Sequence, residues 1–283
     1  MRILVLGASG MLGSAVLRVM SERDEFSVYG TLRSSNPSLQ AIVKQGKLIH
    51  GIHADQPDSL VSAFMQCQPE IVINCVGLVK QLSGSEDPLE AIPINSLLPH
   101  RLARLCKLAK ARLVHISTDC VFSGRRGNYS EADLPDAIDV YGRSKLLGEV
   151  HYPHSVTLRT SIIGHELGSA HGLIDWFLAQ QGSVKGYTDA VFSGLPTCEL
   201  ARVIRDFVIP NTELSGLYHV AAEPISKYDL LQLVNRDYDK ALKIEPDDKV
   251  KINRSLNASR FREYTGYVAS SWPELISQMH KFR

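Results

Sequence analysis

Short runs of aliphatic and β-branched residues alternate along this chain with longer stretches whose apolar positions recur every three or four residues. The short runs predict strands at residues 2–7, 27–32, 47–52, 71–76, 112–117, 155–160 and 216–221. The longer stretches predict helices at residues 11–22, 59–67, 97–110 and 142–150. Strands that alternate with helices are typical of a parallel sheet covered on both faces, so we expect a doubly wound α/β fold.

The alternation loosens after about residue 161, where helical and irregular stretches take over. The strand expected at 216–221 then returns to the main sheet, and residues 222–283 look helical and irregular again. We therefore expect a large α/β domain and a smaller second lobe. The expected boundaries are 1–163 with 189–222 for the domain, and 164–188 with 223–283 for the lobe.

Composition and charge exclude several classes of function. The 283 residues are 44% hydrophobic and 22% charged, as is usual for a soluble globular protein, and the formal net charge is only +1. This balance gives no reason to expect nucleic acid or an anionic membrane surface as a partner. No apolar run approaches the roughly 20 residues of a membrane span. The N-terminal apolar run continues directly into glycines, which favours a buried strand over a signal peptide.

The cysteines show no spacing typical of a metal site, and no secretory signal accompanies them. We therefore expect reduced thiols, no bound metal and a cytoplasmic location. The cysteines are Cys67, Cys75, Cys106, Cys120 and Cys198.

A glycine-rich loop, GASGMLG, follows the first predicted strand and opens the first predicted helix. Glycine allows the backbone to turn tightly and to approach a pyrophosphate, and the start of a helix supplies N–H groups and a positive dipole end. In this context the loop predicts a dinucleotide cofactor. The residues expected to contact it are Gly7, Ser9, Gly10, Met11, Leu12 and Gly13.

The residues after the second predicted strand bear on the choice of nicotinamide cofactor. NAD-selective sites usually place a carboxylate there for the ribose 2′-hydroxyl, but the local sequence GTLRSS contains none. Arg33 instead offers a forked cation for a 2′-phosphate, with Ser34 and Ser35 as further donors. The sequence therefore favours NADPH over NADH. Asp55, after the third predicted strand, is placed for an adenine contact.

Tyr141 and Lys145 stand four residues apart in YGRSKLLGE, so a helix places them on one face. A phenol titrates near pH 10, and a neighbouring ammonium lowers that pKa toward the range useful for acid–base catalysis. Lysine can also hold a cofactor ribose. Thr118 follows the strand at 112–117, at the edge of a parallel sheet where ligands bind, and can hydrogen-bond a substrate carbonyl beside Tyr141.

The end of the fourth predicted strand belongs to the same sheet edge. Cys75, Val76 and Gly77 follow that strand and are expected to line the nicotinamide side of the cofactor site. Asn95 precedes the long helix predicted at 97–110.

These features resemble the extended short-chain dehydrogenase/reductases, which share the glycine spacing GxxGxxG and a Ser/Thr–Tyr–Lys triad. The segments STDCVFSG, YGRSKLLGE, LRTSIIG, FSGLPT and GLYHVA resemble the dTDP-4-dehydrorhamnose reductase family of nucleotide-sugar 4-keto reductases, over most of residues 1–222. The resemblance implies a doubly wound Rossmann domain with a smaller C-terminal substrate-binding lobe. It also implies a role in precursor synthesis for cell-surface polysaccharides and a homodimer formed through helices that flank the sheet.

The resemblance further implies roles for the triad. Hydride would pass from a reduced nicotinamide, NADPH or NADH, to the 4-keto carbon of a nucleotide-linked 6-deoxy sugar. Tyr141 would give a proton to the developing alkoxide, Thr118 would polarise the carbonyl, and Lys145 would hold the ribose and tune Tyr141. Lys80 and Arg262 are further candidates for pyrophosphate or sugar contacts, although solvated surface charges are the more ordinary interpretation of both.

The residues after Thr118 discriminate between relatives. Nucleotide-sugar 4,6-dehydratases carry Thr-Asp-Glu here, whereas this chain has Thr118, Asp119 and Cys120, which argues against a dehydratase. A simple reductase, an epimerase and an epimerase–reductase remain open. Cys120 departs from the STDY of the reductase pattern and resembles the cysteine of the GDP-fucose synthase family, which works with a downstream histidine, here His171.

Under that minority interpretation Cys120, with a thiol pKa lowered by a neighbouring cation, and His171 exchange protons next to the keto group. The simpler alternative is that Cys120 only lines the pocket. A third alternative is that the protein is not an enzyme but a non-catalytic regulatory subunit. The resemblance allows this, because the family includes a reductase-like subunit of methionine adenosyltransferase.

Overall fold

A parallel sheet forms the centre of the computed structural model, which describes residues 1–42, 47–79, 83–168 and 172–283. Its strand order is β11-β6-β5-β4-β1-β2-β3, and every neighbouring pair is parallel. The seven predicted strands are confirmed by this sheet. Their bounds are β1 Arg2–Leu6, β2 Ser27–Thr31, β3 Lys47–Ile49, β4 Ile71–Asn74, β5 Arg112–Thr118, β6 Ser155–Thr160 and β11 Gly216–His219.

Helices cover both faces of this sheet, because its strands are apolar on both sides. In β1 the side chains of Ile3 and Val5 join one core with α1 (Met11–Met20) and α8 (Thr197–Val203). Leu4 and Leu6 point the other way, into a second core. The helices of that second core are α3 (Pro57–Cys67) and α5 (Leu98–Ala109). The doubly wound α/β prediction is therefore confirmed.

The predicted helices differ from the observed ones mainly at their ends. The helix expected at 142–150 is α6, Val140–Leu147, because the Asp139 carboxylate accepts a hydrogen bond from Gly142 N at 2.7 Å and caps its start. The helix expected from residue 97 is preceded by a π-helical turn, Ile92–Leu97. The short helices α2 (Pro37–Ile42) and α4 (Pro88–Ala91) were not predicted.

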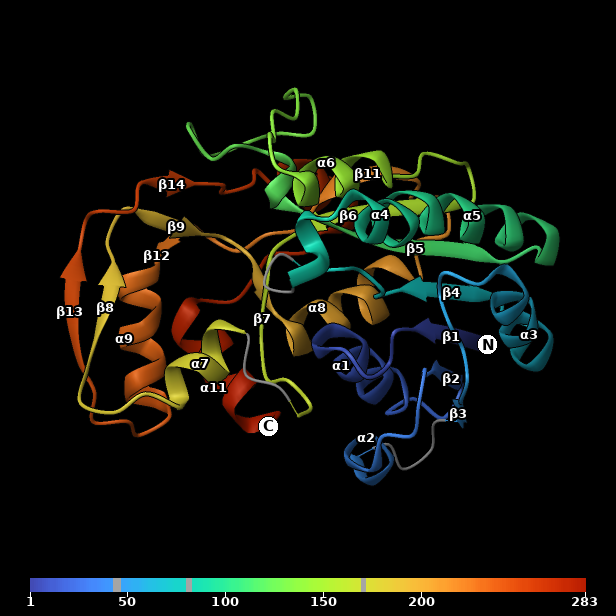
Figure 1. Cartoon of the computed structure of the whole chain (residues 1–283), viewed down its shortest axis with the longest axis horizontal. Coiled ribbons are helices and arrows are strands. Elements are labelled where there is room, and N and C mark those ends of the chain that lie inside the picture. Colours follow the sequence, from blue (N-terminus) through green and yellow to red (C-terminus); the bar gives the residue numbers. More distant parts are fainter. Residues whose placement is uncertain (43–46, 80–82, 169–171) are drawn as a thin grey trace.

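The second half of the chain adds small sheets and helices beside the carboxyl ends of the central strands. In Figure 1 the arrowheads of β1, β4 and β5 point toward the half of the molecule that holds them. The strands are β7 Ile162–Ile163, β8 Ser183–Tyr187, β9 Ala190–Phe192, β10 Leu195–Pro196, β12 Ile225–Ser226, β13 Lys243–Asp247 and β14 Ile252–Asn253. The helices are α7 Leu173–Leu178, α9 Lys227–Asp237, α10 Ser259–Thr265 and α11 Trp272–Lys281.

Strand pairing in this half joins segments that are far apart in the sequence. β8 pairs with β13, and β9 lies between β12 and β14. The strands within 222–283 were not predicted, since two to five residues are too few to show a clear alternation. β9 falls in the segment 189–222 that was expected to return to the large domain, but its partners come from the expected lobe. The domain boundaries themselves stay a prediction.

Candidate active site

The small residues of YGRSKLLGE allow other segments to approach helix α6 closely. A Cβ atom on Gly142 would overlap the carbonyl oxygen of Cys120, and one on Gly148 would overlap that of Asn95. Ser144 is buried and receives a hydrogen bond from Asn95 Nδ2 at 3.2 Å. The helix therefore packs against the end of β5 on one side and against the π-helical turn on the other.

Tyr141 and Lys145 are both brought to the carboxyl end of β5, as predicted. Lys145 is 5% exposed, and its Nζ donates a hydrogen bond to the Ile116 carbonyl oxygen at 2.8 Å. Tyr141 is 8% exposed and is hydrogen-bonded to Thr118, the last residue of β5. The three members of the predicted triad thus meet around one strand end.

The expected lowering of the tyrosine pKa is wrong for the protein without cofactor. Burial raises the pKa of Tyr141 above its ordinary value, and the nearby Cys120 raises it further, while the hydrogen bond with Thr118 lowers it. The phenol therefore keeps its proton at neutral pH, which suits a proton donor.

The pKa of Lys145 is shifted downward, as expected for a buried ammonium. Burial lowers its pKa to about 8, while Glu149 and Cys75 oppose that shift. Glu149 lies one turn along the chain from Lys145 in a buried ion pair with Arg159, with two contacts of 2.6 Å. The Ser117 hydroxyl donates to the same carboxylate at 2.7 Å. A fixed negative charge therefore lies behind the lysine.

The residues after β4 lie beside helix α6; that they line the nicotinamide side of a cofactor site stays a prediction. Leu78 N donates to Asn95 Oδ1 at 2.9 Å, and a Cβ on Gly77 would lie 3.8 Å from the Lys145 Nζ. Cys75, Val76 and Gly77 are half-buried. Asn95 hydrogen-bonds both this loop and Ser144 of α6, so it ties the two together.

The glycine loop approaches the same place from β1. Gly7 has a φ of +78°, and a Cβ on it would lie 3.0 Å from the Val76 side chain. A Cβ on Gly13 would overlap the Gly7 carbonyl oxygen, so helix α1 starts directly against the loop. The glycine loop is thus in contact with the loop after β4.

The loop has the properties of an anion site. Gly10 caps α1 without any side-chain hydrogen bond, and the first turn carries no acidic residue. Ser9 and Gly10 are exposed, Met11 is half-buried and Leu12 is buried. The first N–H groups of the helix are therefore open to a pyrophosphate, and the residues present fit a dinucleotide.

Arg33 and Asp55 lie farther along the same edge. The Arg33 side chain is exposed and has no hydrogen bond or ion pair with the described remainder of the chain. Thr31, two residues earlier, is bonded to the glycine loop through its hydroxyl and its carbonyl oxygen. Arg33 is therefore close in sequence to a residue that touches the loop. Asp55 is exposed, and its carbonyl oxygen accepts a hydrogen bond from Arg101 at 3.5 Å.

The structure does not give Cys120 a reactive thiolate. Burial and the neighbouring Asp119 raise the pKa of the Cys120 thiol to about 12, although Arg254 acts in the opposite direction. The expectation of a cation-lowered thiol pKa is therefore wrong. His171, its expected partner, and Lys80 lie outside the described residues. Arg262 is exposed on α10, where its Nη2 donates to Ser259 Oγ at 3.4 Å.

Sequence reasoning missed two cations beside the triad. Lys227, the first residue of α9, and Arg254, directly after β14, both act electrostatically on Asp119. No spacing in the sequence points to them, because they lie more than 100 residues from Thr118. Their place follows only from the pairing of β12 and β14 with β9.

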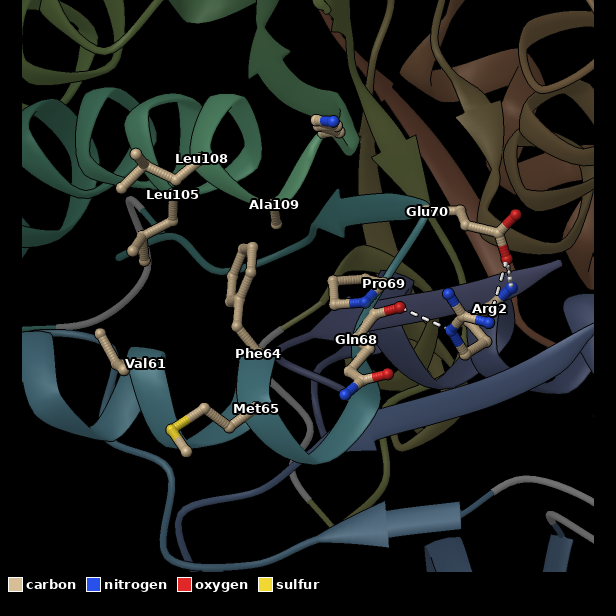
Figure 2. Close-up of a pocket in the computed structure, with 11 residues that line it drawn as sticks. Arg2, Val61, Phe64, Met65, Gln68, Pro69, Glu70, Leu105, Leu108 and Ala109 are labelled. Atoms are coloured by element: carbon tan, nitrogen blue, oxygen red, sulfur yellow. Dashed lines mark hydrogen bonds and ion pairs between the residues drawn. The ribbon is translucent and has the colours of Figure 1, made fainter.

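A surface groove lies away from this centre (Figure 2). It is formed by α3 and α5 and by the amino ends of β1 and β4, where Arg2 Nε donates to the Gln68 carbonyl oxygen at 2.6 Å. Its other lining residues include Phe64, Met65 and Leu108. The triad is at the carboxyl ends of the strands, so the groove is not part of the candidate active site.

Residues 1–264 match the family model described as RmlD substrate binding domain. The chain belongs to this family. A curated relative, the probable low-salt glycan biosynthesis reductase Agl14 of Haloferax volcanii, is 29% identical over 230 residues, 77% of this chain and 74% of that protein. Methionine adenosyltransferase 2 subunit beta of Danio rerio is 28% identical over 243 residues, 81% of this chain and 71% of that protein.

A solved structure supports the fold. The dTDP-4-dehydrorhamnose reductase of Bacillus anthracis, crystallised in complex with NADP, has a TM-score of 0.80 to this chain at 20% identity, covering 100% of this chain and 99% of that one. The predicted family, an extended short-chain class of NAD(P)-dependent oxidoreductases, is confirmed. No helix within the described ranges is long and apolar enough to cross a membrane.

Proposed function

We propose that this protein reduces the 4-keto group of a nucleotide-linked 6-deoxy sugar with NADPH. The observation that carries the proposal is the meeting of Thr118, Tyr141 and Lys145 at the end of β5. They lie beside the loop after β4, which also contacts the glycine loop. This arrangement offers a proton donor, a carbonyl ligand and a cation on one side of a dinucleotide site. Family membership supports the substrate class.

NADPH, when bound, supplies the hydride that reduces the keto carbon. The Tyr141 phenol, which burial keeps protonated, gives its proton to the oxygen of the former carbonyl. The Thr118 hydroxyl hydrogen-bonds the same oxygen and stabilises the charge that develops on it. Lys145, with Glu149 behind it, would hold the ribose of a bound cofactor, and its positive charge would favour the phenolate that forms when the proton leaves.

Our preference for NADPH over NADH rests on Arg33. It is exposed two residues after Thr31, which contacts the glycine loop, and it has no partner in the described chain. The segment 32–35, directly after β2, contains no carboxylate. A guanidinium matches the geometry of a 2′-phosphate. We also propose, from the class of reaction and the glycan biosynthesis relative, that the product serves in making cell-surface polysaccharide, and that the protein acts in the cytoplasm.

An epimerase–reductase is the second candidate, because Cys120 lies two residues beyond Thr118. The neutral, half-buried thiol makes exchange at the neighbouring carbons slow. Incubation with a 4-keto sugar and NADP⁺ in heavy water separates the two functions. Deuterium at the carbons that flank the ketone, lost in Cys120→Ser, would establish epimerisation.

The test of the proposed function is the oxidation of NADPH, followed by absorbance, with dTDP-, UDP- and GDP-linked 4-keto-6-deoxy sugars. We expect turnover with one of the three, and none in Tyr141→Phe, which retains NADP⁺ binding. The similarity to a methionine adenosyltransferase beta subunit makes the opposite outcome informative. Binding of NADP⁺ with no turnover of any sugar would refute the reductase and favour a regulatory subunit.

A further inference from the structure

The buried ion pair of Glu149 and Arg159 lies directly behind the candidate active site. Arg159 Nε donates to one carboxylate oxygen of Glu149 and Arg159 Nη2 to the other, both at 2.6 Å. The Ser117 hydroxyl donates to the first of these oxygens at 2.7 Å. Ser117 is paired with Arg159 across β5 and β6, and it directly precedes Thr118. Since all three side chains are buried, these three hydrogen bonds fix the carboxylate in place.

Arg159 is fixed as firmly as its partner. Its third nitrogen, Nη1, lies 3.3 Å from His219 Nε2, and its guanidinium lies 5.2 Å from the centre of the Phe122 ring. His219 Nδ1 donates to the Tyr129 carbonyl oxygen at 3.0 Å, so Nε2 of the neutral ring accepts from Arg159. Burial and the neighbouring Arg159 lower the pKa of His219 to about 4, which keeps the ring neutral. The guanidinium therefore has no freedom to release Glu149.

Lys145 reaches the same part of β5 as Glu149. Its Nζ donates to the carbonyl oxygen of Ile116, and the peptide group of that carbonyl joins Ile116 to Ser117, the residue that bonds Glu149. Glu149 raises the pKa of Lys145 electrostatically, but no hydrogen bond joins the two side chains in the described part of the chain. An ammonium has three donors, so Glu149 supports the charge of Lys145 while leaving donors open to a ligand.

The other titratable groups around Lys145 are neutral near pH 7. Burial raises the pKa of the Cys75 thiol, on the loop after β4, to about 12. Burial lowers the pKa of His115, on β5, and Lys145 acts in the same direction. Tyr141, on the same helix as Lys145, keeps its proton. Among the described groups that act on Lys145, Glu149 is therefore the one that supplies a negative charge.

The free energy of folding does not by itself explain an ion pair at this place. Taking two charges out of water costs about as much as their attraction returns, so apolar residues of the same volume are often as stable. Lys145, in contrast, needs a neighbouring anion, because burial lowers its pKa to about 8 even with Glu149 opposing that shift. These observations favour a role for Glu149 in the charge of Lys145.

We propose that Glu149 is a positioning residue, whose carboxylate, held by Arg159 and Ser117, keeps Lys145 charged and leaves its donors free for a bound cofactor. The proposal rests on the proposed function for the contact between Lys145 and the cofactor ribose. Arg159 contributes by holding the carboxylate in place, so that it does not turn toward Lys145 and occupy the same donors. The cofactor affinity then depends on pH over a range that Glu149 sets.

The first test measures the charge of Lys145 in the full chain without cofactor. The Cε resonance of Lys145, ¹³C-labelled and assigned by comparison with Lys145→Met, is followed from about pH 6 to about pH 11. Glu149→Gln removes the negative charge and leaves Arg159 unbalanced, so it should lower the titration midpoint by about one pH unit or more. The double variant Glu149→Gln/Arg159→Met should lower it less, and it leaves no unpaired buried cation to destabilise the fold.

Glu199→Gln is the matched control. Glu199 of α8 also accepts a hydroxyl hydrogen bond, from Tyr267 at 2.9 Å, and lies 3.8 Å from Arg202, but it does not act on Lys145. Its loss should leave the midpoint of Lys145 unchanged.

The second test is the affinity for NADP⁺ as a function of pH. The wild type should bind severalfold more tightly than Glu149→Gln at about pH 7, where only the wild-type lysine is fully charged. The two should bind alike above about pH 10, where neither lysine is charged. A merely structural role would give a ratio of affinities that is the same at every pH.

The proposal is overturned if Glu149→Gln and Glu199→Gln leave the Lys145 midpoint equally unchanged, or if the ratio of NADP⁺ affinities does not vary with pH. If Glu149→Gln does not fold, an unchanged midpoint in the double variant overturns it. Neither test needs a sugar, so both are independent of the reductase assay. A protein that turns over no 4-keto sugar but shows the shifted midpoint and the pH-dependent ratio would lack the proposed function and retain the positioning residue.

Discussion

The two sides of the candidate active site are built in different ways. On the proposed cofactor side, seven consecutive residues, 7–13, form the loop, and its features are backbone features: a left-handed Gly7 and a helix start without a side-chain cap. On the proposed substrate side, Asp119, Cys120, Lys227 and Arg254 come from three separate segments and act through their side chains. The first side is local in sequence, and the second exists only in the folded chain.

Tyr141 and Lys145 stand between these two sides and belong to both. Their helix is packed against Cys120 through Gly142 and against Asn95 through Gly148 and Ser144. The comparison therefore predicts that changes at the triad affect chemistry, that changes in the loop affect folding and the cofactor, and that Arg33 affects only the choice of cofactor.

The largest effect is expected from Tyr141→Phe. The substitution removes one hydroxyl and leaves a ring of the same shape in a buried position, so the fold and the NADP⁺ affinity should stay unchanged. Loss of the proton donor should lower kcat by about 10²–10⁴-fold. Steady-state kinetics and cofactor titration check this. Near-normal turnover would show that the proton comes from another group.

The second prediction concerns the charge on Lys145. Its pKa falls from 10.5 in the unfolded chain to about 8 in the folded protein, so between those values the unfolded state binds the extra proton. Stability must then rise with pH across this window, on the order of 3 kcal/mol in total. The measurement is urea unfolding at several pH values, with Lys145→Met as the reference. A difference between the two proteins that stays flat from pH 8 to 10 would contradict it.

The third prediction compares two glycines of the same loop. A methyl group at Gly13 would overlap the Gly7 carbonyl oxygen, whereas at Gly10 it would lie 3.4 Å from that oxygen, an ordinary contact. Alanine is the better helix former by about 1 kcal/mol, but overpacking against backbone costs about 1–3 kcal/mol. Gly13→Ala should therefore lower the free energy of unfolding and weaken NADP⁺ binding. Equal stability of Gly13→Ala and Gly10→Ala would count against this packing.

The smallest expected effect is the change in cofactor preference caused by substitution of Arg33. Arg33→Ala should reduce the preference for NADPH over NADH by about tenfold, the value of one charge-assisted contact at an exposed position, and leave NADH affinity unchanged. Arg33→Lys should be intermediate, because it retains the charge without the fork. Fluorescence titration with both cofactors measures this. A preference unaffected by either variant would remove Arg33 from the site.

Much of the fold could be predicted because its signals are local. Each strand of the central sheet is an apolar run buried on both faces, and each helix between them shows its own apolar period. The short strands β9, β12 and β14 carry no such signal, since two or three residues have no period. They form because the chain brings them together, which is why the action of Lys227 and Arg254 on Asp119 was not foreseen.

The candidate site shows the same division between local sequence signals and tertiary contacts. The sequence by itself determined the glycine loop, the spacing of Tyr141 and Lys145, and the hydroxyl at the end of β5, since each depends on neighbours within a few residues. The tertiary structure decided the protonation states. Burial raises the pKa of Tyr141 and of Cys120 against the expectation from their neighbours in sequence. Desolvation depends on all surrounding segments, and that is a property no short stretch of sequence contains.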